Sequence, residues 1–178
     1  VLAHALASQV KLEVVETEHR GHAMTVARAA ARGELGDVGL VVAHGGDGTV
    51  NEVVNGLMDG ARRAAVHAPM LGVVPGGSAN VFARALGLPR DPVEATHRLL
   101  PAVATPSPRR VGLGIADSGG AGADDDVAGA VASGARWFTF NAGLGWDADV
   151  VAGVDARRGK RTSPSLYACT AVSAYLRP

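Results

Sequence analysis

The stretch from residue 38 to residue 58 constrains the fold most, because a glycine turn there joins a strand pattern to a helix pattern. An apolar run rich in β-branched residues ends at His44, and the turn Gly45-Gly46-Asp47-Gly48-Thr49 follows directly. The next apolar residues recur at i, i+3, i+4 and i+7, which is the period of a helix. They are Val50, Val53, Val54 and Leu57. The stretch therefore predicts a strand, a tight turn and a helix N-terminus, as in α/β domains.

The residues of this turn indicate a particular chemistry. Glycine has no Cβ, so backbone N–H groups in the turn can approach a phosphate closely. The helix that follows adds unpaired N–H donors and the positive end of its dipole. Asp47 would repel phosphate, so its presence favours a phosphotransferase site in which a carboxylate orients a metal–nucleotide complex or accepts a proton. The alternative is a strand-to-helix turn whose glycines serve only steric needs.

A second turn of the same kind follows one α/β repeat later. Met70 to Val74 reads as a short buried strand, Pro75 to Asn80 as a glycine turn, and Val81 to Leu86 as a helix. In a parallel sheet both turns would lie at the carboxyl ends of their strands, where ligands bind. The sequence therefore predicts that the two turns share one ligand site.

The rest of the chain gives a coarse pattern of further elements. Helices are predicted at Val1–Val10, Gly21–Arg32, Asp91 to about Leu100 with Asp91 as N-cap, Asp147–Val154 and Ser165–Leu176. Strands are predicted at Lys11–Thr17, Val111–Ala116 and Arg136–Gly143, with a hairpin tip at 118–134. Because an α/β unit normally opens with a strand, we expect one to precede Val1.

Composition narrows the class of protein. The net charge is zero, which argues against a nucleic-acid partner held by bulk electrostatics. Cys169 is the single cysteine, so a disulfide framework and a cysteine metal site are excluded. No signal peptide or bilayer-length apolar run is present in the sequence. We therefore expect a cytoplasmic protein without a transmembrane segment.

Three motifs, in this order, identify a family. They are Gly45–Leu57 (GGDGTVNEVVNGL), Pro75–Pro89 (PGGSANVFARALGLP) and Phe140–Ala148 (FNAGLGWDA). Together they resemble the bacterial diacylglycerol kinase and sphingosine kinase family of lipid kinases. The first motif is shared with NAD kinases and phosphofructokinases, whereas the second and third are specific. The resemblance covers nearly the whole chain, but the family's opening strand and its later part are missing, so the chain resembles a fragment.

The resemblance implies both a fold and a reaction. It implies a Rossmann-like α/β nucleotide-binding domain of the phosphofructokinase and NAD kinase type at 1–103, followed by the start of a β-sandwich domain at 104–178. The active site of the family lies in the cleft between these domains. The family uses ATP and Mg²⁺ to phosphorylate a lipid hydroxyl, such as that of diacylglycerol or a sphingoid base, at a membrane surface. Peripheral membrane association and homodimerisation are left open.

The resemblance also implies roles for individual residues. Asp47 would position the metal or the reacting hydroxyl, while the main catalytic base and the magnesium ligands of the family lie beyond Pro178. The fragment alone is therefore expected to be inactive. Ser78 replaces the usual threonine, and Val81 replaces an aspartate, which leaves any polar role at that position unfilled. The expected nucleotide contacts are Thr17, Gly45, Gly46, Asp47, Gly48, Thr49, Val50, Asn51, Glu52, Gly77, Ser78 and Asn80.

Two other functions remain open from the sequence. An NAD kinase would share the first motif, although it lacks the second. A nucleotide-binding regulatory protein that has lost catalysis would bind ATP and transfer no phosphate. The sequence does not identify the lipid.

Overall fold

The computed structural model describes residues 7, 10–64, 68–116, 136–142, 146–156 and 169–170. The chain divides into two compact units, a first unit from Val1 to Phe140 and a second unit from Asn141 to Pro178. The candidate site lies entirely within the first unit.

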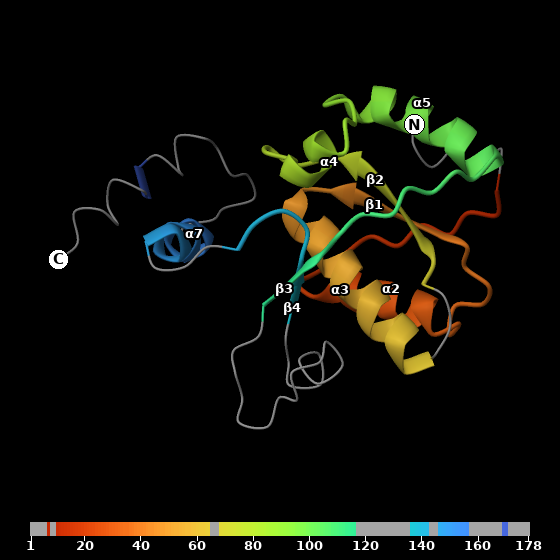
Figure 1. Cartoon of the computed structure of the whole chain (residues 1–178), viewed down its shortest axis with the longest axis horizontal. Helices are drawn as coiled ribbons and strands as arrows, with labels where there is room; N and C mark the ends of the chain where they lie inside the picture. The colour runs from red at the N-terminus through yellow and green to blue at the C-terminus, as the bar shows by residue number, and fades with distance from the viewer. Residues whose placement is uncertain are drawn as a thin grey trace. The chain divides into compact units, whose positions relative to one another are not determined.

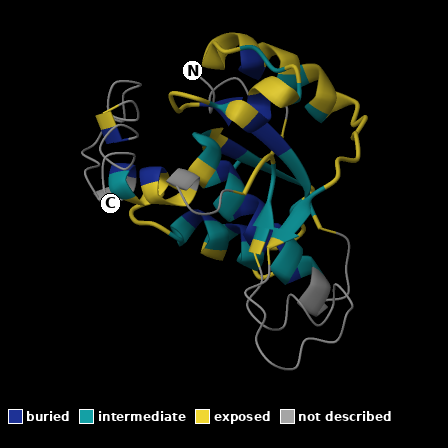
Figure 2. Ribbon diagram, turned by 60° about the vertical axis from the view of Figure 1, so that its left-hand side comes forward, coloured by how far each residue is buried: buried dark blue, intermediate teal, exposed yellow. Residues whose placement is uncertain are grey.

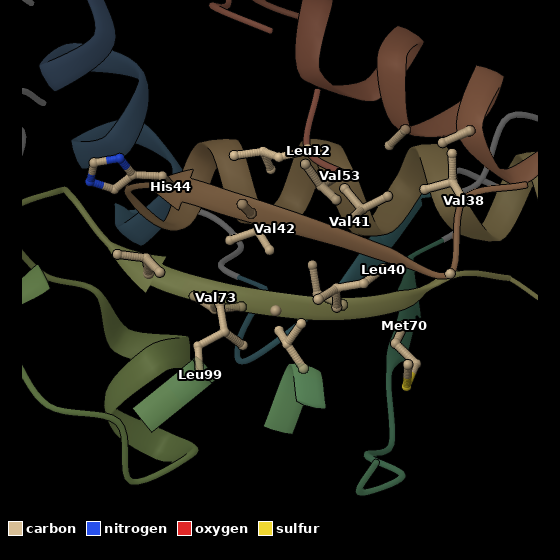
Figure 3. Close-up of a pocket in the computed structure, with 18 of the residues that line it drawn as sticks. Leu12, Val38, Leu40, Val41, Val42, His44, Val53, Met70, Val73 and Leu99 are labelled. Atoms are coloured by element: carbon tan, nitrogen blue, oxygen red, sulfur yellow. The ribbon is translucent and has the colours of Figure 1, made fainter. Parts of the chain in front are cut away.

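A parallel pair of strands forms the centre of the first unit. β1 (Leu40–Gly45) pairs with β2 (Met70–Pro75), and the register runs from Leu40 opposite Met70 to Gly45 opposite Pro75. Figure 3 shows the two strands running in the same direction, with His44 near the carboxyl end of β1. Both glycine turns therefore leave the same edge of the sheet, as the sequence predicts.

Helices cover both faces of this strand pair. α2 (His22–Ala31) and α3 (Asp47–Ala64) lie on one side of β1 and β2, and α5 (Pro92–Ala104) lies on the other (Figure 1). The short helix α4 (Val81–Ala85) follows the second glycine turn. The buried core takes residues from α2, α3, α4 and the strands, and Figure 2 colours buried residues dark blue; the α/β architecture is confirmed. The core includes Ala23, Ala27, Ala31, Ala43, Val50, Val53, Leu57, Val73, Phe82 and Ala83.

Small residues allow α2 and α3 to cross closely. A Cβ added at Gly56 would contact Met24 O and would lie 2.8 Å from the Cβ of Ala27. One turn later, a Cβ at Gly60 would lie 2.6 Å from the Cβ of Ala31. An ion pair between Arg28 Nε and Asp59 Oδ2, 2.6 Å apart, joins the same two helices. Backbone-to-backbone approach therefore fixes the position of α3.

We expect Gly56→Val to destabilise the fold more than other glycine substitutions in α3. The new side chain meets backbone atoms of α2, and overpacking of this kind costs about 1–3 kcal/mol or more. Urea unfolding followed by circular dichroism should show a lower midpoint. Gly48→Ala in the same helix is the control, because a Cβ at Gly48 meets no atom within 4 Å. Equal midpoints for the two variants would contradict the close crossing.

The start of α5 confirms one prediction, and its end corrects another. The side chain of Asp91 accepts hydrogen bonds from Val93 N and Glu94 N, at 3.0 and 2.9 Å, as an N-cap does. The helix continues through Pro101 to Ala104 instead of ending near Leu100. Proline lacks one N–H donor, but its fixed φ is close to the helical value, so the last turn can still form.

The predicted strands are shorter in the structure or are not formed. Residues 11–17 are not a strand, because their β-branched pattern supplies propensity but no ladder of hydrogen bonds pairs them. The strands predicted at 111–116 and 136–143 are shorter in the structure. They are β3 (Gly114–Ala116) and β4 (Arg136–Phe138), which pair antiparallel. In the described part of the chain these are the strands that follow Pro101, so a β-sandwich is not confirmed.

In the second unit, α7 (Trp146–Ala156) matches the helix predicted at 147–154. Val150 and Val154 are its buried side chains among those described. The predicted helices at 1–10 and 165–176 lie largely outside the described residues, and the predicted hairpin tip at 118–134 lies wholly outside them.

Candidate functional site

The two glycine turns pack against each other backbone to backbone. Gly76 N donates a hydrogen bond to Gly45 O at 2.9 Å. A Cβ built on Gly77 would lie 2.6 Å from Gly46 Cα, closer than real Cβ atoms approach. A Cβ on Gly45 would lie 2.7 Å from Thr49 Oγ1. Glycine is therefore favoured at Gly46, Gly76 and Gly77 by the contact between the two turns, and at Gly45 by Thr49 of its own turn.

Gly48 differs from the other glycines of the turns. It is exposed, and a Cβ built on it meets no atom within 4 Å. Val50 N donates to Gly46 O at 3.1 Å, which starts the hydrogen bonding of α3. The N–H groups that precede Val50 have no carbonyl partner inside the helix. The N-terminus of α3 thus presents donors beside an open surface, an arrangement suited to an anion.

Exposed residues of the second turn lie beside this helix N-terminus. Residues 76–79, which include Gly77 and Ser78, are all exposed. The contacts of Gly76 and Gly77 with Gly45 and Gly46 place this segment next to the start of α3. The surface therefore combines a helix N-terminus with two hydroxyl-bearing residues, Thr49 and Ser78.

Asp47 connects the two turns through its carboxylate. Asp47 Oδ1 accepts a hydrogen bond from Phe82 N at 3.0 Å, so the first residue of α3 caps the N-terminal end of α4. Sequence analysis assigns Asp47 a role at the metal or the reacting hydroxyl and does not foresee this contact. Because a carboxylate has two oxygens, Oδ2 can still serve a reacting group while Oδ1 holds Phe82 N.

Asn80 holds the second turn closed. Its Oδ1 accepts from Gly77 N at 2.9 Å, and its Nδ2 donates to Gly77 O at 2.7 Å. The backbone of Asn80 is left-handed, with φ of 47°, a conformation that asparagine tolerates better than most residues. The side-chain oxygen and nitrogen of Asn80, a predicted nucleotide contact, thus both form hydrogen bonds inside the turn.

Three other residues predicted to contact the nucleotide either form hydrogen bonds within the protein or are at least partly buried. Glu52 Oε1 accepts from Gly21 N at 2.9 Å and so holds the start of α2. Val50 has 2% of its surface exposed and belongs to the core, and its N–H is used by Gly46 O. Asn51 is half-buried, and its Oδ1 is buried without a hydrogen-bond partner among the described residues.

Thr17 lies in the lining of a hollow beside the strand pair. This open hollow of about 1460 Å³ runs along β1 and β2 and is lined mainly by apolar side chains (Figure 3). Thr17 and Thr49 are the predicted nucleotide contacts that line it. The hollow therefore borders the surface formed by the two turns at Thr49.

The sequence alone does not indicate that Asn55 joins α3 to β4. This residue of α3 has 7% of its surface exposed, and its side-chain amide binds the backbone of Trp137 in β4. The sequence feature that could have pointed to Asn55 is its polar side chain at a helix position between Val54 and Gly56, which are both buried. Asp47, Glu52 and Asn55, here called the α3 tethers, each hold the backbone of a segment distant in the sequence.

The described carboxylates near the turns are partly used by hydrogen bonds within the protein. Among the described residues, no group of three histidine, cysteine, aspartate or glutamate side chains is placed to hold a metal ion. At the turns, Asp47 and Glu52 each give one carboxylate oxygen to a backbone N–H. No catalytic step is assigned to a metal here.

Comparison with known proteins identifies relatives. Residues 1–108 match the model of the diacylglycerol kinase catalytic domain. A Chromohalobacter salexigens protein named "Probable lipid kinase YegS-like" is 48% identical over 103 residues, covering 58% of this chain and 30% of that protein. A Bacillus subtilis diacylglycerol kinase is 44% identical over 101 residues, covering 54% of this chain and 32% of that protein. The chain spans about a third of the length of these curated relatives.

Proposed function

The chain belongs to the diacylglycerol kinase catalytic domain family, and on that premise we propose that the full-length protein is an ATP-dependent lipid kinase. It transfers the γ-phosphoryl group of ATP to a lipid hydroxyl, such as that of diacylglycerol or a sphingoid base. The observation that carries this proposal is the open N-terminus of α3 at Gly48, beside the second glycine turn. This surface has the donors and the steric freedom that a polyphosphate requires.

The nucleotide phosphates contact the N–H groups of the first turn and the hydroxyls of Thr49 and Ser78 in this proposal. Gly46 and Gly77 contribute by letting the turns approach each other, Gly45 leaves room for Thr49, and Asn80 keeps the second turn closed. Asn51, whose Oδ1 is buried without a hydrogen-bond partner among the described residues, remains a proposed contact that awaits a direct test. Thr17 is likewise a proposed contact.

Asp47 is the residue proposed to act on the acceptor. Its Oδ1 is fixed by Phe82 N, so the direction of its carboxylate relative to both turns is set before substrate binds. The second oxygen can then orient the acceptor hydroxyl or take its proton. Phosphoryl transfer depends mainly on positioning and charge, so this preorganisation matters more than basicity alone. Mg²⁺ is the proposed companion of ATP, held by phosphates and by groups outside the described residues.

Residues 104–178 are proposed to open a second, β-rich domain after a nucleotide domain at 1–103. The β3–β4 hairpin would be its first described part. In the described part of the chain, no helix is both long and apolar enough to cross a bilayer. We also propose that the protein acts in the cytoplasm and meets its lipid at a membrane surface.

A transfer assay with labelled ATP tests this function. The full-length protein is incubated with γ-labelled ATP and, separately, with diacylglycerol, a sphingoid base, a polyprenol and NAD. Label in a lipid product supports the lipid kinase and names its acceptor. Label in NADP would replace the proposal with an NAD kinase. ATP binding without any labelled product would indicate a regulatory protein.

A further inference from the structure

Asn55 makes a two-sided contact with the backbone of one residue. Asn55 Nδ2 donates to Trp137 O at 2.9 Å, and Trp137 N donates to Asn55 Oδ1 at 2.9 Å. Nδ2 also donates to Asn51 O at 2.8 Å, one turn earlier in α3. The amide thus offers Trp137 the donor and the acceptor that a neighbouring strand would offer. We call this contact the Asn55 clamp.

The Asn55 clamp joins α3 to a hairpin that lies close to the end of the first unit. Trp137 is the middle residue of β4 and pairs with Ile115 of β3, so the clamp fastens the β3–β4 hairpin to α3. Phe140 is the last residue of the first unit, and Asn141 begins the second. The clamp therefore fixes the place at which the chain leaves the first unit.

The same helix carries the clamp and the proposed phosphate surface. Gly48 and Asn55 are both in α3, and a helix rises about 1.5 Å per residue, so they lie about 10 Å apart along a rigid axis. The close crossing with α2 holds this helix in place. A backbone fastened to Asn55 is therefore also fixed relative to the turn that starts α3.

We propose that Asn55 is a positioning residue for phosphoryl transfer, holding the β3–β4 hairpin at a fixed distance from the phosphate surface within the first unit. This inference rests on the proposed function. Loss of the clamp should leave the turns intact and therefore leave nucleotide affinity unchanged. It should lower kcat, because small misplacements of reacting groups cost large factors in rate.

The experiment compares Asn55→Ala and Asn55→Asp with a control. Asn55→Asp keeps the shape and one acceptor but places an oxygen against the carbonyls of Trp137 and Asn51. Thr96→Ala is the control, because Thr96 is equally buried and its hydroxyl bonds only Pro92 O of its own helix among the contacts described. Where Asn55→Ala does not fold, Asn55→Ser takes its place, since a serine hydroxyl in a helix can bond the carbonyl one turn earlier, here Asn51 O, and still lacks the two-sided contact with Trp137.

Three measurements give the result. In the 178-residue chain, hydrogen exchange at residues 136–138 should become about tenfold faster or more in both Asn55 variants, while exchange in α3 stays unchanged. In the full-length protein, kcat should fall about tenfold or more with the Kd for ATP within a factor of about two. Thr96→Ala should leave both kcat and exchange at 136–138 unchanged.

Two results separate failure of this inference from failure of the proposed function. Wild-type kcat in the Asn55 variants of an active full-length protein would overturn the positioning role while leaving the kinase proposal standing. If the unaltered full-length protein phosphorylates no lipid, the kinase proposal fails, and the positioning role fails with it. Unchanged exchange at 136–138 in the variants would overturn the clamp itself.

Discussion

The Gly48→Val variant is expected to lose ATP binding while remaining folded. A Cβ at this position meets no atom within 4 Å, so a valine is expected to fit the fold and to project into the space that the phosphates would occupy. Valine also has a better helix propensity than glycine, so α3 should not be weakened. Charge-assisted hydrogen bonds contribute about 1.5–3 kcal/mol each, so blocking two of them should raise the Kd by about 100-fold or more.

Calorimetry with ATP on the 178-residue chain measures this effect. Gly39→Val is the matched control, because Gly39 also has no atom within 4 Å of an added Cβ but precedes β1, at the far end from the turns. Its Kd should equal that of the unaltered chain. Gly77→Ala should behave differently from both, since its Cβ would collide with the backbone of Gly46 and lower the unfolding midpoint. An unchanged Kd in Gly48→Val would mean that nucleotide does not bind over this helix N-terminus.

The Asp47→Asn variant of the full-length protein is expected to lose phosphoryl transfer with little loss of nucleotide affinity. Asparagine retains an Oδ1 that can accept from Phe82 N, so the link between the turns survives. What disappears is the negative charge and the second carboxylate oxygen. Removing a positioned acid–base group costs about 10²–10⁴-fold in rate.

Steady-state kinetics and ATP calorimetry on the same preparations separate the two effects. Asp91→Asn is the matched control, because Asp91 caps α5 through the same kind of carboxylate-to-backbone bond, on a different helix. Asp47→Ala should additionally lower the unfolding midpoint, since Phe82 N loses its acceptor. Near wild-type turnover in Asp47→Asn would reduce Asp47 to a structural cap.

The parts of the fold that local patterns encode were predictable. The apolar run ending at His44 and the helical spacing from Val50 place β1 and α3 correctly, and Asp91 followed by Pro92 marks the start of α5. The segment 11–17 was not predictable in the same way. Its residues favour a strand, but a strand also requires a partner, and propensity carries no information about pairing.

The location of the candidate site could be predicted from the sequence, but the separate roles of its residues could not. The glycine pattern indicates close approach, yet only the structure shows that Gly46 and Gly77 allow contact between the turns while Gly48 faces open space. The α3 tethers were equally hidden. Asp47 reaches Phe82, Glu52 reaches Gly21 and Asn55 reaches Trp137 across long stretches of sequence, and such pairings leave no local pattern.

Amide NMR of the ¹⁵N-labelled 178-residue chain, titrated with ATP in the presence of magnesium, tests the phosphate surface most directly. The proposal predicts that the largest shifts fall on the N–H groups of residues 46–49 and 76–79, the two turns that pack together. Amides of α5, on the other face of the strands, should remain unmoved. Shifts confined to other residues, or no saturable shift at the turns, would contradict it.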